Sequence, residues 1–147
     1  MNPETTTLRQ ARDHMTERFD EGTKCPCCGQ FVKRYKRKLN SGMARTLIQM
    51  FKHHPDRYID VKPFLLNHGY KNSHDWTLLK HWGILTVRED GKYKITQMGR
   101  NFLSGFPTHS HIYMYNNKMM GFAEGQTTIS AALGEPFDLT ELMHEQT

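Results

Sequence analysis

The chain has 147 residues and a formal net charge of +5, from 20 Lys and Arg against 15 Asp and Glu. Hydrophobic residues make up 37% of it, which is enough for one compact core and argues against a wholly disordered chain. No run approaches the roughly 18–20 apolar residues of a membrane span, and no basic-then-apolar leader opens the sequence, so a membrane or secreted protein is not expected. Three cysteines within four positions do not make a disulfide framework, so we expect a cytoplasmic protein.

Positive charge is concentrated in the first third of the sequence. Between Gly22 and Pro55 there is no Asp or Glu but there are eight Lys or Arg, whereas after Lys118 there are five acidic residues and no basic one. A basic segment and an acidic tail favour a surface that faces a polyanion. Two ordinary solvated faces are the alternative.

Apolar residues at helical spacing predict a helix near the start of the chain. Leu8, Ala11, Met15 and Phe19 form its apolar stripe, and the preceding Thr5–Thr7 segment offers capping residues. We expect this stripe to dock against the rest of the protein.

The same spacing, with helix-stop residues, predicts further helices in chain order. They are one from Met43 to His53 after the Asn40-Ser41-Gly42 cluster, one around Pro63 to Leu66, one carrying Trp76, Leu79 and Trp82 and capped by Ser73 or Asp75, one after Thr96, and one or two between Ile129 and Met143.

Extended segments alternate with these helices. Tyr58 to Val61 is a brief extended piece, and Ile84 begins a strand. Asp90-Gly91 predicts a tight hairpin between LTVRE and KYKIT, and a second hairpin is expected around Asn116-Asn117 in HIYMYNNKMMGF.

From Met43 to Leu103 this order is that of a winged helix-turn-helix domain. The segment LLKHWGILTVREDGKYKITQMGRNFL resembles the helix–wing stretch of winged-helix transcription regulators, with an L-x-x-x-G-I/L-L pattern followed by T-x-x-G-x-x-F/L. The positions that match are Leu79, Gly83, Ile84, Leu85, Thr96, Gly99, Phe102 and Leu103.

We therefore expect a mainly helical α+β protein in three segments. Residues 1–41 would hold the N-terminal helix, a cysteine knuckle and a basic strand. Residues 42–105 would form the winged-helix core, and residues 106–147 a hairpin and an acidic helical tail packed on it.

The resemblance implies a nucleic-acid surface, because in DNA-binding winged helices the third helix enters the major groove and the wing touches the backbone. The helix candidates are Asn72, Ser73, His74, Thr77, Lys80 and His81, and the wing candidates are Arg88, Lys92 and Lys94. The solvated side of a half-buried helix is the alternative.

The two tryptophans of the third helix are six positions apart. In an α-helix this separates Trp76 and Trp82 by about 240°, so we do not expect both to face one core. We expect the outward one to be covered by the N-terminal helix or the tail; stacking on a base or anchoring a partner are the alternatives.

The CPCCG segment resembles one knuckle of a zinc ribbon. Its Pro and Gly bend the backbone so that Cys25 and Cys28 reach one metal. A second knuckle is absent, so His111 and then His109, two apart on an extended strand, are the predicted further ligands of a structural zinc. The remaining candidates are the adjacent pair His53 and His54, which would point about 100° apart on a helix, and His14 and Cys27. Redox chemistry at the C-x-x-C spacing and unligated thiols are the alternatives.

Enzyme signatures are absent from the sequence. It has no H-E-x-x-H or H-x-E motif, no phosphate-binding glycine loop and no G-x-S-x-G, so we expect no catalytic activity.

The densest basic run follows the knuckle, in FVKRYKRKLNSGMAR. A strand here would put alternate side chains on opposite faces, and either face could neutralise phosphates. The candidates are Lys33, Arg34, Lys36, Arg37 and Lys38. An acidic protein partner and a charge-protected edge strand are the alternatives.

The knuckle, the winged helix and the second hairpin together are similar to small uncharacterised phage and prophage proteins. We expect a DNA- or RNA-binding regulator in the cytoplasm, that of a host if the protein is phage-encoded. The alternative is a protein-binding module that inhibits or redirects a host protein. The sequence leaves the oligomeric state open.

Overall fold

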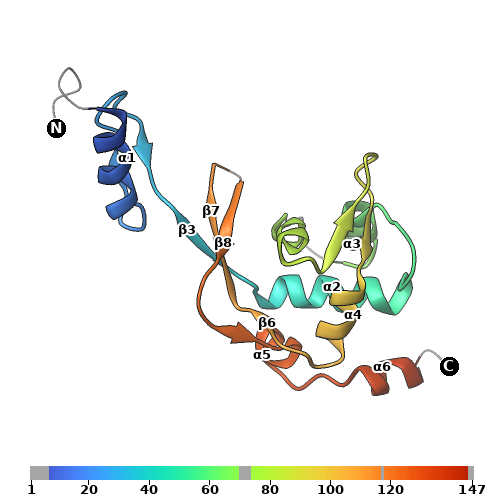
Figure 1. The fold of residues 1–147 in the computed structure, drawn as a ribbon. Coiled ribbons are helices and arrows are strands. Elements are labelled where there is room, and N and C mark those ends of the chain that lie inside the picture. The colour runs from blue at the N-terminus through green and yellow to red at the C-terminus, as the bar shows by residue number, and fades with distance from the viewer. Residues whose placement is uncertain (1–6, 70–73, 117, 146–147) are drawn as a thin grey trace. The chain divides into compact units, whose positions relative to one another are not determined.

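The computed structural model describes residues 7–69, 74–116 and 118–145. These residues form a mixed α+β fold of six α-helices, one 3₁₀ helix and nine short strands, which confirms the predicted α+β class (Figure 1). Contacts divide the chain into two units: an N-terminal unit of Met1–Arg37 with Ile112–Ala123, and a main unit of Lys38–His111 with Glu124–Thr147.

This division differs from the three predicted segments because strands far apart in the sequence pair with each other. The central sheet of the N-terminal unit has the order β3-β7-β8, so β3 (Tyr35–Lys38) lies beside β7 (His111–Tyr115). The second hairpin, formed by β7 and β8 (Lys118–Phe122), therefore groups with the basic strand.

The rest of the N-terminal unit is one helix and one small hairpin. Helix α1 (Leu8–Glu17) begins at Thr7, whose hydroxyl accepts from the Gln10 backbone N–H in a capping box. Strands β1 (Thr23–Lys24) and β2 (Phe31–Val32) pair antiparallel and carry the cysteine loop between them.

The main unit is built around helix α2 (Ser41–His53). Its N-cap is Asn40, whose side chain accepts from the Met43 N–H at 2.9 Å. Leu47 and Met50 of α2 are fully buried, and the helix contacts both η1 (Asp75–Trp82) and α5 (Ile129–Leu133). Figure 1 shows α2 running through the middle of this unit.

The remaining elements of the main unit follow in chain order. They are α3 (Val61–Asn67), β4 (Leu85–Val87), β5 (Tyr93–Ile95), α4 (Gln97–Leu103), β6 (Thr108–His109), β9 (Gln126–Thr127) and α6 (Leu139–Glu145).

The expectation that Trp76 and Trp82 would not face one core is wrong, because the third helix is 3₁₀ rather than α-helical. A 3₁₀ helix has three residues per turn, so side chains six positions apart lie on the same face. Trp76, Leu79 and Trp82 are all buried, and the Trp82 Nε1–H donates to the His109 carbonyl at 2.7 Å. The expectation that neither ring would be left exposed is confirmed.

The start and end of η1 were only partly predicted. Its N-cap is His74, with no side-chain capping bond, and Asp75 is its first helical residue. Ser73, the other predicted cap, lies outside the described residues. Gly83 ends the helix in the left-handed conformation at φ +77°.

Candidate functional site

The β4–β5 hairpin is the best-defined candidate surface of the main unit. Leu85 pairs with Ile95 and Val87 with Tyr93, and the Arg88 N–H donates to the Lys92 carbonyl at 2.8 Å. Gly91 closes the turn at φ +82°, where a residue with a side chain would be strained. The hairpin predicted from Asp90-Gly91 is therefore present.

An ion pair stiffens the tip of this hairpin. The Arg88 guanidinium donates to both carboxylate oxygens of Asp90, at 3.1 and 2.8 Å, and the Lys92 N–H also donates to that carboxylate at 3.2 Å. These bonds, the one from Arg88 first, lower the pKa of Asp90 to about 2. Asp90 thus offsets part of the positive charge of Arg88.

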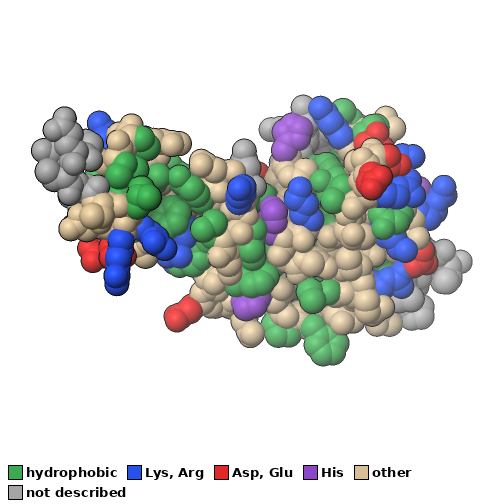
Figure 2. Space-filling view, turned by 45° about the horizontal axis from the view of Figure 1, so that its top comes forward, with side chains coloured by type: hydrophobic (Ala, Val, Ile, Leu, Met, Phe, Trp, Pro, Cys, Tyr) green, Lys and Arg blue, Asp and Glu red, His purple; other side chains and the backbone are tan. Residues whose placement is uncertain are grey.

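Two cations of the hairpin lie against one aromatic ring. The Tyr58 ring centroid is 4.6 Å from Arg88 Cζ and 5.7 Å from Lys94 Nζ, within the range of cation–π attraction. We call Tyr58, Arg88, Lys92 and Lys94 the wing cluster. Figure 2 shows Lys and Arg side chains gathered with Asp and Glu at the right of the face in view.

Sequence reasoning missed Tyr58, which is placed by its neighbour. Ile59 and Tyr93 exchange backbone hydrogen bonds, both at 2.9 Å, so the chain before α3 runs beside β5. The signal was present as a short extended piece with Ile59 at its centre, but its pairing partner could not be read from local sequence.

The predicted helix surface is only partly available for contacts. His74 and Lys80 are exposed, whereas Thr77 and His81 are half-buried. The Thr77 hydroxyl donates to the His74 carbonyl at 2.6 Å, and burial, with Lys80 adding to it, lowers the pKa of His81. The predicted Asn72 and Ser73 lie outside the described residues.

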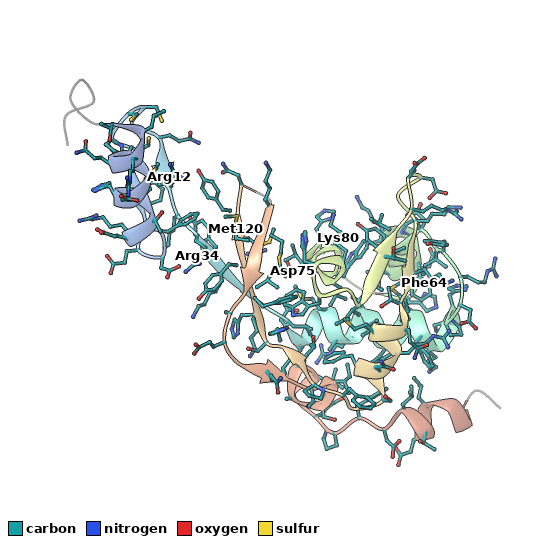
Figure 3. The ribbon with its side chains drawn as sticks, in the orientation of Figure 1. Arg12, Arg34, Phe64, Asp75, Lys80 and Met120 are labelled. Carbon is teal, nitrogen blue, oxygen red and sulfur yellow. The ribbon has the colours of Figure 1, made fainter. Side chains whose placement is uncertain are left out.

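A carboxylate also lies on this helix. Asp75 accepts from the Asn40 side-chain amide at 3.4 Å, and Figure 3 shows Asp75 and Lys80 extending from η1. Lys80, the exposed cation of η1, is therefore close in sequence to Asp75, whose carboxylate accepts a hydrogen bond from the N-cap residue of α2.

In the N-terminal unit, the arginine at the second cationic position of the basic run, Arg34, has a structural partner. Arg34 donates to both carboxylate oxygens of Asp20, at 2.7 and 2.9 Å, and its Cζ lies 3.7 Å from the Tyr113 ring centroid. Such a bidentate, stacked arginine is well suited to holding the segment before β3 against β7.

The other predicted cations of this run are on or beside β3. Lys36 Nζ lies 5.7 Å from the Tyr113 ring centroid, and Lys33 Nζ lies 5.1 Å from that of Tyr35. All four residues of β3, including Arg37 and Lys38, are exposed. The structure thus brings the predicted cations of residues 33–38 onto one strand and its approach.

The cysteine loop has the backbone bonding of a tight knuckle. The Cys25 N–H donates to the Gln30 carbonyl at 2.7 Å, and the Gly29 N–H donates to the Cys25 carbonyl at 2.8 Å. Hydrogen bonds from the backbone of Cys28, then of Cys27, lower the pKa of the Cys25 thiol. Burial raises the pKa of Cys27, and none of the three is in a disulfide.

The two predicted histidine ligands do not lie on one strand. His109 belongs to β6, which pairs with β9, whereas His111 belongs to β7 in the β3-β7-β8 sheet. The break falls at Ser110, whose N–H donates to the Gly125 carbonyl and whose carbonyl accepts from the Leu39 N–H.

The described parts of the chain hold no group of three or more His, Cys, Asp or Glu that could bind a metal together. Cys25 and Cys28 are in the N-terminal unit, and His109 and His111 are assigned to the main unit. A zinc bound by these four residues stays a prediction.

None of the helices in the described ranges is both long and apolar enough to cross a bilayer. Comparison with protein families, curated proteins and solved structures finds no match to this chain.

Proposed function

We propose that the protein is a non-enzymatic nucleic-acid-binding regulator of the phage type, with a winged helix-turn-helix over residues 42–105. The element order α2, Ile59 pairing, α3, η1, β4, β5 and α4 supports this assignment. The observation that carries it is the wing cluster, in which a protruding hairpin carries three cations.

The chemistry of the wing cluster suits a phosphate backbone. Lys92 is exposed, and Arg88 and Lys94 are held in position by the half-buried ring of Tyr58. Side chains that are already ordered lose less conformational entropy when they bind phosphate. Each phosphate they neutralise releases condensed counterions, so binding would be favourable and salt-dependent.

The second part of the proposed interface is η1. Lys80 of η1 and His74 at its N-cap are exposed, and the predicted Asn72 and Ser73 come directly before His74 in the sequence. In this reading the wing cluster and the basic residues of β3 supply affinity, and η1 supplies any recognition of base edges.

The loop between β1 and β2 is proposed to be a structural zinc knuckle with Cys25 and Cys28 as ligands. Amide groups that lower the pKa of Cys25 favour the thiolate, which is the form that binds zinc. In this proposal the metal holds the loop that leads into the basic strand.

A protein-binding module is the second candidate function. It is favoured by a hollow of about 300 Å³ on the main unit, lined by Met98, Phe102, Phe106, His109 and other residues. Met98 and Phe106 are more than half exposed, at 54% and 62%. Exposed apolar side chains around a hollow are typical of surfaces that receive a partner's side chain.

The test is fluorescence anisotropy with a labelled 20-base-pair duplex and a labelled single strand. For the nucleic-acid proposal, we expect affinity for one of them to fall at least tenfold between 50 and 200 mM salt. Affinity that is absent, or unchanged by salt, contradicts it. A host-protein pull-down that survives nuclease treatment would then favour the second candidate.

A further inference from the structure

Two histidine rings meet where helices α2 and α3 end. His53 is the last residue of α2, and His68 is the C-cap of α3. Their ring centroids are 4.5 Å apart, with 51° between the ring planes. Both rings also lie against the buried ring of Phe64, at 5.6 and 4.4 Å between centroids; Figure 3 labels Phe64.

One nitrogen of His68 is already committed to the backbone. His68 Nδ1 lies 2.8 Å from the Phe64 carbonyl oxygen. A carbonyl can only accept, so Nδ1 must carry the proton, and in the neutral ring Nε2 then keeps its lone pair. Metal-binding histidines are commonly held in this way, with the second nitrogen donating to a carbonyl.

The spacing of the rings fits two imidazoles on one ion. With a metal–nitrogen bond of about 2.0–2.1 Å, the ion lies about 3.2 Å from each ring centroid. Two centroids 4.5 Å apart then subtend about 90° at the ion, which falls among the angles of common coordination geometries.

We propose that His53 and His68 form a binding site for a divalent transition-metal ion of the kind that prefers imidazole, such as Zn²⁺, Ni²⁺ or Cu²⁺. Both side chains belong to exposed residues, so an ion can reach them from solvent. Two protein ligands leave the remaining coordination positions to water. The site depends neither on the cysteine loop nor on the proposed function.

Such a site would link the end of α2 to the end of α3. An ion that binds only the folded protein raises the ratio of folded to unfolded protein by a factor of 1 + [ion]/Kd, so the stabilisation keeps growing with ion concentration. At an ion concentration of about 100 times Kd, the ratio of folded to unfolded protein rises about 100-fold.

The experiment uses the full chain with Cys25, Cys27 and Cys28 all changed to Ser, which removes the thiols as competing ligands. Ni²⁺ and Zn²⁺ binding is measured by calorimetry and thermal melting at pH 7.5. We expect one ion per chain and a raised melting temperature. His53→Ala and His68→Ala should each weaken binding at least tenfold and abolish the shift.

His54→Ala is the matched control. His54 follows His53 in sequence and also lies against Phe64, at 5.4 Å between centroids, but the pairing with His68 is made by His53. We expect it to bind the ion with unchanged affinity. The proposal is overturned if all three variants bind the ion as tightly as the unsubstituted protein. It is also overturned if His54→Ala loses as much affinity as His53→Ala and His68→Ala.

A measurement on the protein with all its histidines present keeps the proposal testable if a histidine variant fails to fold. Substoichiometric paramagnetic Ni²⁺ should broaden the imidazole NMR signals of His53 and His68 before those of His81 and His109. Broadening that begins at any other histidine contradicts the site.

Discussion

Gly99 packs its backbone directly against the carbonyl oxygen of Ile84. A Cβ at position 99 would lie 2.5 Å from that oxygen and 2.9 Å from Ile95 Cγ2. Thr96, the N-cap of α4, donates its hydroxyl toward the Gly83 and Ile84 carbonyls and accepts from the Gly99 N–H at 3.0 Å. The T-x-x-G spacing thus fixes α4 against the start of β4.

Gly99→Ala is therefore expected to destabilise the protein by about 1–3 kcal/mol, the usual cost of overpacking against backbone. The loss in the free energy of unfolding is measured by urea denaturation monitored by circular dichroism. Gly42→Ala is the control, because its Cβ would meet only the Asn40 side chain, at 3.4 Å, and alanine favours a helix. Equal stability of wild type and Gly99→Ala would contradict this close contact.

The two buried tryptophans should respond differently to loss of the indole N–H. Trp82→Phe removes the hydrogen bond that the indole N–H donates to the His109 carbonyl, which costs about 0.5–1.5 kcal/mol in addition to the lost packing. Trp76 Nε1 has no hydrogen-bond partner among the described residues, so Trp76→Phe should cost less. The measurement is the free energy of unfolding of each variant, and Trp82→Phe should lose more of it than Trp76→Phe. A larger loss in Trp76→Phe would count against the described packing of η1.

The low pKa of Asp90 makes part of the folding stability pH-dependent. The folded pKa is about 2 against an ordinary 3.8, so this stability is present above about pH 4 and lost as the pH falls toward 2. An NMR titration of the Asp90 carboxyl should give a midpoint near 2, moving up toward 3.8 in Arg88→Ala. Glu89→Gln is the control and should leave the midpoint unchanged. A midpoint near 3.8 in the wild type would rule out the ion pair.

The proposed zinc knuckle predicts a difference among its cysteines. Protein purified with zinc should hold one tightly bound ion at the loop, and Cys25→Ser or Cys28→Ser should lose it. Cys27→Ser should retain it, because Cys27 occupies the variable position of the knuckle. Elemental analysis of the three variants after desalting measures this. Equal loss in all three, or no zinc in the wild type, would contradict the proposal.

Local features of the fold could be predicted because their causes are local. Asn40 and Thr96 cap α2 and α4 with side chains that reach backbone N–H groups three residues on. Asp90-Gly91 closes its hairpin because glycine adopts positive φ without strain. These signals lie within a few residues of the structure they determine.

What the sequence did not predict depends on long-range pairing or on helix type. Tyr58 joins the wing cluster only because Ile59 pairs with Tyr93, 34 positions later. His109 and His111 separate because Ser110 bonds to two other segments. Trp76 and Trp82 share a face because the helix that carries them is 3₁₀, which periodicity alone does not distinguish from an α-helix.

The wing cluster is proposed to bind a nucleic-acid backbone. The most direct test compares wild type with Arg88→Ala/Lys94→Ala in a salt series from 50 to 300 mM, using a 20-base-pair duplex. Arg9→Ala/Lys118→Ala is the charge-matched control, with both changes at exposed positions of the N-terminal unit. We predict that the wing variant binds more weakly. Its negative slope of log affinity against log salt should become shallower by about 2, whereas the control should keep the wild-type slope. Identical slopes for wild type and wing variant would contradict phosphate binding by the wing cluster.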